Sequence, residues 1–222
     1  MDGAVDSLAQ RARAGALVRL GIMGGTFDPP HLGHLACAEE ALEAANLDAV
    51  LFVPTGRPAF KQDRLVTAGE VRLAMVAAAV AGNPAFAVSA LEVERPGITY
   101  AVDTWRARRE ERPGVELVFI VGADAALTLP RWRKSAELAH LAAFAAATRP
   151  GFELGEQALR DLREHGFDVR PFAVPGLDIS SSALRRRVYA GRTIRYLVPE
   201  AVRKIIEEES LYRRETDGGR VA

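Results

Sequence analysis

The stretch MGGTFDPPHLGH, residues 23–34, sets the first turn of the fold from a strand into a helix. It follows the apolar run LVRLGI and opens with Gly24 and Gly25. It also holds His31 and His34, two of the four histidines in the chain. Glycines at this point let backbone N–H groups approach a ligand closely, because no Cβ stands in the way. We expect the next helix to begin near His31 or Leu32.

Apolar runs typical of strands recur along the chain, with helix-like segments between most of them. The runs span residues 17–23, 49–54, 86–91, 115–122, 142–148 and 167–174. Helical patterns or helix-end signals mark 32–46, 67–82 and 98–112, and Thr67 and Glu70 have the spacing of a capping box. This alternation predicts an α/β fold, a Rossmann-like open parallel sheet with helices on both faces.

Composition narrows the class of protein. The chain has 222 residues, and hydrophobic residues make up 49% of it, enough for a sizeable core. Its 29 basic residues balance 29 acidic ones, which argues against a duplex-binding or membrane-surface protein. Cys37 is the only cysteine, so a disulfide within the chain and a zinc–cysteine cluster are excluded.

No signal-peptide pattern or membrane-length apolar run is found, so we expect a cytoplasmic protein without nucleic-acid or membrane partners. We expect one domain over residues 19–213. Residues 1–18 and 214–222 are expected to be a flexible extension and a flexible tail. The sequence leaves homo-oligomerisation open.

The two histidines point to an anion. In an open parallel sheet, ligands lie beyond the carboxyl ends of the strands, and helix N-termini favour anions. At spacing i, i+3, His31 and His34 share the first helical turn and can bind phosphate. A glycine turn with two helix-capping histidines is the alternative. The chain lacks G-x-G-x-x-G and a Walker A loop at this turn, and the positive helix end disfavours a metal beside Asp28.

This stretch resembles the signature of nucleotidyltransferases that carry an H-x-G-H motif. It is most similar to that of the bacterial nicotinate-nucleotide adenylyltransferases, with Pro30 where isoleucine is usual. Four more stretches resemble the same family in the same order: PTGRPAFK (54–61), RPGITYAVDTW (95–105), FIVGADAALTLPRW (119–132) and ISSSALR (179–185). The second of the five lacks the usual second proline and histidine before Lys61, and the last has Ser182 in place of threonine.

The resemblance implies a function and a set of site residues. The implied enzyme transfers the adenylyl group of ATP to nicotinate mononucleotide in NAD biosynthesis, with Mg²⁺ carried by ATP. The implied catalytic residues are His31, His34 and Arg185. The implied ATP-binding residues are Gly24, Gly25, Thr26, Phe27, His34, Lys61, Gly122, Asp124, Ile179, Ser181, Ser182 and Arg185. Those implied for nicotinate mononucleotide are Thr99, Tyr100 and Trp132.

Some of these residues also have an interpretation of their own. Asp124 follows a predicted strand, where a carboxylate suits a ribose hydroxyl. Three serines can cap the helix that starts near residue 181, and Arg185 is expected in its first turn, a position that a bound anion would favour. Trp132 is interpreted equally well as a core residue or as a ring that stacks on a ligand, whereas Trp105 is expected in the core. The alternatives are a sister enzyme, such as phosphopantetheine adenylyltransferase, and a dinucleotide-binding oxidoreductase.

Overall fold

The computed structural model describes residues 10, 14, 16, 18–58, 66–111, 114–149 and 151–213. The strands are β1 (Val18–Gly25), β2 (Ala49–Pro54), β3 (Arg57–Pro58), β4 (Phe86–Val88), β5 (Ile98–Thr99), β6 (Val115–Gly122), β7 (Ala143–Thr148) and β8 (Val169–Ala173). The helices are α2 (Leu32–Ala44), α3 (Gly69–Val80), α4 (Leu91–Glu94), α5 (Ala101–Glu111), α6 (Ala123–Ala126), α7 (Ser135–Leu141), α8 (Glu156–Glu164), α9 (Ser181–Tyr189), α10 (Glu200–Glu208) and the 3₁₀ helix η1 (Leu129–Arg131).

Six strands form one parallel sheet in the order β4-β2-β1-β6-β7-β8. The chain runs outward from β1 to one side, then returns to place β6 on the other side of β1. Strand order therefore reverses between β1 and β6, and the crevice beyond their carboxyl ends is where sheets of this kind bind ligands. The predicted open parallel sheet is confirmed.

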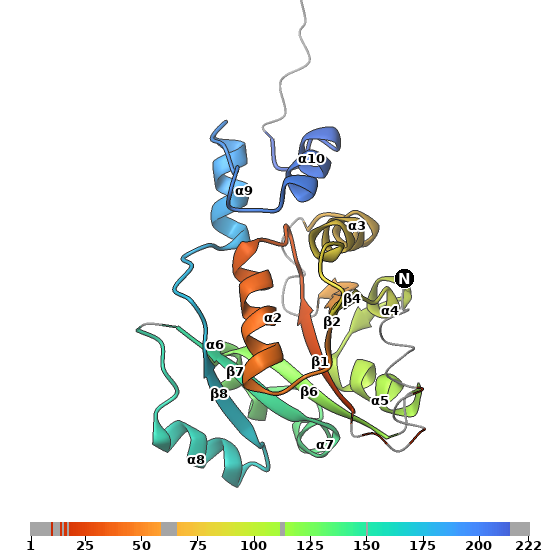
Figure 1. Ribbon diagram of the computed structural model, residues 1–222, viewed down its shortest axis with the longest axis vertical. Coiled ribbons are helices and arrows are strands. Elements are labelled where there is room, and N and C mark those ends of the chain that lie inside the picture. The colour runs from red at the N-terminus through yellow and green to blue at the C-terminus, as the bar shows by residue number, and fades with distance from the viewer. Residues whose placement is uncertain are drawn as a thin grey trace, which may run out of the picture.

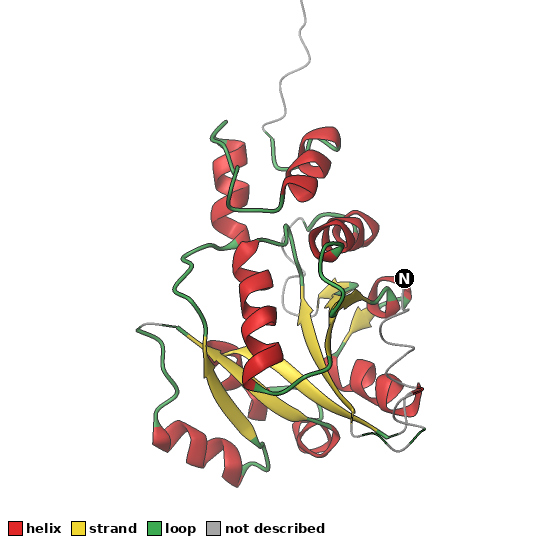
Figure 2. Cartoon of the chain, in the orientation of Figure 1, coloured by secondary structure: helices red, strands yellow, loops and turns green. Residues whose placement is uncertain are grey.

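Helices cover both faces of this sheet, as Figure 2 shows with helices in red and strands in yellow. On one face, α2 and α3 pack on β1, β2 and β6 through residues such as Ala38, Val76 and Phe52. On the other face, α5 and α7 contribute Trp105 and Leu138 to a second core cluster. β2 is buried along its whole length, because both of its faces are covered.

The C-terminal helices pack against α3 rather than against the sheet. Leu184, Val202 and Ile206 from α9 and α10 form a third apolar cluster with Met75 of α3. In Figure 1, α9 lies just beyond the N-terminal end of α2. The last part of the described chain therefore reaches the turn that carries the histidines.

Three local predictions were wrong. α3 begins at Gly69 with Ala68 as its N-cap and no side-chain cap, so Thr67 and Glu70 form no capping box. β4 ends at Val88, and the Ser89 hydroxyl instead accepts a hydrogen bond from the N–H of Leu91, where α4 begins.

The third wrong prediction concerns 98–112, which is not helical throughout. Ile98 and Thr99 pair with β3 as β5, and α5 begins only at Ala101.

Among the described residues, no helix is long and apolar enough to span a membrane.

Candidate active site

A cavity of about 370 Å³ lies at the point where the strand order reverses. The ends of β1 and β6 form its floor, and α2, α6 and the segment before α9 form its walls. Nine of the residues expected in the site line it: Gly24, Gly25, Phe27, His31, His34, Gly122, Asp124, Trp132 and Ile179. Segments up to 155 residues apart in the chain thus meet at one cavity.

The two histidines form a stacked pair at the start of α2. Their ring centroids are 3.7 Å apart with an angle of 27° between the planes. The backbone N–H of His31, the N-cap residue, donates to Nδ1 of His34 at 3.2 Å. Because Nδ1 of His34 accepts this bond, the neutral ring carries its proton on Nε2. His34 is thereby oriented as a hydrogen-bond donor through Nε2, the arrangement that a phosphate oxygen requires.

Burial changes the chemistry of His31. The side chain is 6% exposed, and desolvation lowers its pKa from 6.5 to about 4. The ring is therefore neutral at pH 7 in the free protein, and it can donate a hydrogen bond but carries no charge. Its Nδ1 is buried and has no hydrogen-bond partner within the described part of the chain. A Cβ on Gly33 would lie 3.1 Å from this atom, so the glycine of the H-x-G-H motif leaves room for the ring.

The N-terminal amides of α2 are only partly available to an anion. The Leu32 N–H donates to the carbonyl oxygen of Leu197 at 3.1 Å, and the His31 N–H is engaged by His34. We expected the free N–H groups of this helix end to favour an anion, but the N–H groups of His31 and Leu32 already have partners. The histidine side chains face the cavity, and the C-terminal segment occupies part of the helix end.

Trp132 lies at the other wall of the cavity. Its Nε1 donates to the Thr128 hydroxyl at 2.9 Å, and its ring meets that of Phe119 edge to face at 5.8 Å. The side chain is half-buried, so the indole is held in place while it lines the cavity. Trp105, by contrast, is 1% exposed and belongs to the core, as expected.

Six predicted residues do not line this cavity: Thr26, Thr99, Tyr100, Ser181, Ser182 and Arg185. Lys61 lies outside the described residues. Thr99 is buried in β5, and Arg133 lies over the Tyr100 ring at 4.3 Å.

The start of α9 joins the histidine loop by hydrogen bonds instead. Ser181 Oγ donates to the Pro29 carbonyl at 2.8 Å, and Arg185 donates to the Asp28 carbonyl at 2.7 Å. Ser180 is the N-cap and α9 starts at Ser181, so Arg185 is the fifth helical residue and not part of the first turn. Its side chain still reaches the N-terminal end, because helical side chains tilt in that direction.

The segment 95–100, which contains the residues implied to bind nicotinate mononucleotide, lies beside the turn that follows β2. A Cβ on Gly56 would lie 2.0 Å from the carbonyl oxygen of Glu92, so only glycine fits there. The Glu92 carboxyl is buried, and Thr104 donates to it at 2.6 Å. Burial raises the pKa of Glu92 above its usual range. Gly56 thus packs against α4, and the pairing of β3 with β5 joins the same turn to the 95–100 segment.

Sequence reasoning missed Arg72. Its guanidinium is 2% exposed and donates to the carbonyls of Thr26, Gly56 and Thr67 at 2.8, 2.9 and 2.8 Å. One side chain on α3 therefore holds three loops at the carboxyl edge of the sheet. The signal was an arginine on the apolar face of its helix, three residues before the fully buried Met75.

Arg149 and Phe152 were also missed, although both line the cavity just after β7. The N–H of Phe152 donates to the carbonyl of Arg149 at 2.8 Å, which closes a tight turn. Their position at the carboxyl end of a parallel strand was the available signal. Cys37 lines the same cavity from α2, and burial raises the pKa of its thiol to about 12.

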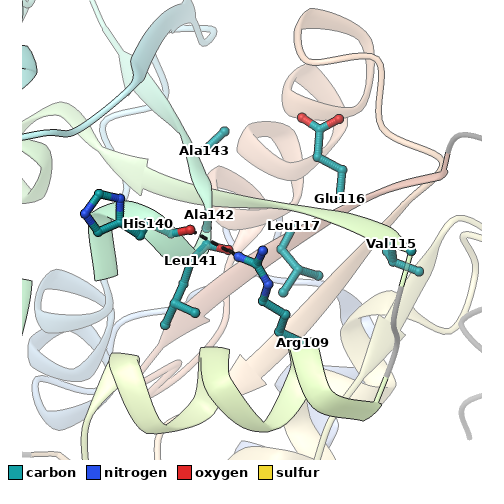
Figure 3. Close-up of a pocket in the computed structure, with 9 residues that line it drawn as sticks. Arg109, Val115, Glu116, Leu117, His140, Leu141, Ala142 and Ala143 are labelled. Atoms are coloured by element: carbon teal, nitrogen blue, oxygen red, sulfur yellow. Dashed lines mark hydrogen bonds between the residues drawn. The ribbon is translucent and has the colours of Figure 1, made fainter. Parts of the chain in front are cut away.

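A second cavity, of about 600 Å³, lies at the opposite edge of the sheet, where β6 and β7 begin (Figure 3). There Arg109 donates to the carbonyls of His140 and Leu141 at 3.1 and 3.2 Å, which satisfies the end of α7. Ligands of parallel sheets bind at the carboxyl edge, so this cavity is not the candidate site.

Fold and site together define a nucleotidyltransferase. The model of the cytidylyltransferase-like family matches residues 22–187, and the chain belongs to this family. The chain is 48% identical to a probable nicotinate-nucleotide adenylyltransferase of Corynebacterium kroppenstedtii, covering 87% of this chain and 90% of that protein. It is 44% identical to a protein of the same description from Herpetosiphon aurantiacus, covering 87% and 98%.

Solved structures share the fold. The Plasmodium falciparum nicotinic acid mononucleotide adenylyltransferase complexed with NaAD superposes with a TM-score of 0.73 at 20% identity, covering 88% of this chain and 97% of that chain. The same enzyme complexed with APC gives a TM-score of 0.71 at 19% identity. At these identities the likeness concerns the fold alone.

Proposed function

We propose that this protein transfers the adenylyl group of ATP to nicotinate mononucleotide, giving nicotinate adenine dinucleotide and pyrophosphate in NAD biosynthesis. The observation that carries the proposal is the stacked histidine pair in a chain of this family. The pair lines the cavity at the point where the strand order reverses. The 44–48% identity to proteins described as nicotinate-nucleotide adenylyltransferases supports the choice of acceptor.

The chemistry requires no protein nucleophile. The attacking group is a phosphate monoester of the mononucleotide, which is largely a dianion at neutral pH because its second pKa is about 6. Catalysis then consists of positioning the reactants and stabilising charge on the α-phosphate and the leaving pyrophosphate. In this proposal His31 and His34 donate to phosphate oxygens, and Arg185 supplies positive charge. Asp124 holds a ribose hydroxyl, and Trp132 covers the pyridine ring.

Mg²⁺ belongs to the proposal as the ion carried by the triphosphate. Within the described residues no group of three His, Cys, Asp or Glu side chains is arranged to hold a metal ion. Oxygen ligands from substrate phosphates suit Mg²⁺. The ion would neutralise part of the negative charge of the triphosphate, to which the histidines and Arg185 also bind in this proposal. We further propose a cytoplasmic location, because ATP and mononucleotides are cytoplasmic metabolites.

Pyrophosphate release from ATP tests the proposal with three acceptors: nicotinate mononucleotide, nicotinamide mononucleotide and phosphopantetheine. We expect rapid release with the first, at least about tenfold lower kcat/KM with the second, and none with the third. Mass spectrometry of the product identifies the dinucleotide. Activity with phosphopantetheine alone would instead make the protein a sister adenylyltransferase.

A further inference from the structure

The last described segment of the chain contacts the histidine loop through Tyr212. Its hydroxyl donates to Oδ1 of Asp28 at 2.5 Å, across 184 residues of sequence. Tyr212 has a φ of 61°, in the left-handed region that bulky residues rarely adopt. Such a conformation persists only where the surroundings over-determine it, and it is a reason to look for a functional constraint.

Asp28 is buried, with 4% exposed, so every donor that reaches its carboxylate matters. Besides Tyr212, the Thr67 N–H approaches Oδ2 at 3.4 Å, and Arg185 lies 4.0 Å from the same oxygen. The guanidinium of Arg185 is at present hydrogen-bonded to the Asp28 backbone carbonyl rather than to the carboxylate. A buried carboxylate that lost its best donor would draw a neighbouring cation to itself, and Arg185 is placed to respond, because the other neighbour, Arg72, is held by three carbonyls.

Tyr212 is a permanent donor at physiological pH. Burial, together with the negative charge of Asp28, raises the pKa of the phenol above its usual range. The side chain of Arg185 keeps 30% of its surface exposed, so it can still move toward a ligand. The Tyr212 hydroxyl thus satisfies the Asp28 carboxylate, while the Arg185 guanidinium beside it stays available to a ligand.

We propose that Tyr212 is a positioning residue for ATP: by satisfying the Asp28 carboxylate, it keeps Arg185 from being captured there and leaves the guanidinium available to the nucleotide phosphates. This inference rests on the proposed function. It gives the C-terminal end of the described chain a part in substrate binding, although Tyr212 does not line the cavity.

The test replaces Tyr212 by phenylalanine, which removes one oxygen atom and keeps the ring. We expect KM for ATP to rise on the order of tenfold, while KM for nicotinate mononucleotide stays within about twofold. The control is Tyr196→Phe, since Tyr196 is 83% exposed, and it should change neither constant. Thermal melting of each variant establishes that it is folded at the assay temperature.

The Asp28→Asn background tests the route through the carboxylate. Because the competing charge is gone, Tyr212→Phe should leave KM for ATP within about twofold of that of Asp28→Asn alone. If Tyr212→Phe by itself does not fold, a full rise in KM for ATP in this background would still refute the proposal. An equal rise in both KM values, a fall in kcat alone, or a full further rise in the Asp28→Asn background would overturn the proposal.

Calorimetric titration of ATP into the wild type and Tyr212→Phe, without an acceptor, separates this inference from the proposed function. A wild type that binds ATP but does not react with nicotinate mononucleotide contradicts the function, and the ratio of the two ATP dissociation constants still tests Tyr212. Equal dissociation constants refute the role of Tyr212 even if the reaction is as proposed.

Discussion

His31 should make the protein less stable in mild acid. Its pKa is about 4 in the folded protein, against 6.5 for an unperturbed histidine, because burial disfavours the charged ring. Between these pH values the unfolded chain binds a proton that the folded protein does not. Stability therefore increases with pH through this window, and it is lost as pH falls from 6.5 toward 4.

The magnitude follows from the shift. At about 1.4 kcal/mol per pKa unit, lowering the pKa from 6.5 to about 4 corresponds to roughly 3 kcal/mol of unfolding free energy. That is a large share of the stability of a typical domain, about 5–15 kcal/mol. Because the residue is 6% exposed, little of this effect is screened by solvent.

Urea unfolding at a series of pH values measures the effect in wild type and in His31→Gln. The difference in unfolding free energy between the two proteins should change by about 3 kcal/mol between pH 7 and pH 4. His165→Gln is the matched control, since His165 is exposed, and it should follow the wild-type profile. NMR of the ring resonances gives the pKa of His31 directly.

If the unfolding free energies of wild type and His31→Gln changed in parallel with pH, the conclusion that the His31 ring is buried and neutral would be refuted. The NMR titration of the His31 ring, repeated in the presence of pyrophosphate, tests whether the ring binds phosphate. An anion beside the ring favours its charged form, so the pKa of His31 should rise above about 4 when the ligand binds. No rise would contradict the assignment of His31 as a phosphate ligand.

The remaining predictions concern turnover, recognition and loop stability. His34→Ala should lower kcat about 10²- to 10³-fold with the fold intact, since one preorganised donor to developing charge is lost; near-normal pyrophosphate release at saturating ATP would contradict this. Trp132→Ala should raise KM for nicotinate and nicotinamide mononucleotides alike and leave their ratio unchanged, because stacking does not distinguish a carboxylate from an amide; a changed ratio would argue against a stacking role. Arg72→Met leaves the carbonyls of three loops without their donor and should lower the unfolding free energy by about 3–5 kcal/mol. In the same urea titration the exposed Arg186→Met should change it by less than about 0.5 kcal/mol, and equal losses would refute the role of Arg72.

Local pattern was enough to predict most of the elements. The apolar run before Gly24 became β1, α2 begins at Leu32 with His31 as its N-cap, and the two histidines share one helical turn. Strand and helix preferences depend on neighbours a few residues away, so they leave a trace in sequence. Of the three local predictions that failed, those at Thr67 and Ile98 lie where the side chain or the backbone bonds to a distant segment.

The sequence by itself determined that strands alternate with helices and that glycines and histidines follow the first strand. Only the tertiary structure decided which groups meet there: Arg185 and Tyr212 reach Asp28 across 157 and 184 residues, and Arg72 ties three loops together. Such contacts have no period in the sequence, because they depend on how α3, α9 and α10 pack. The pKa of His31 depends likewise on burial, a property of the whole fold and not of the motif that contains it.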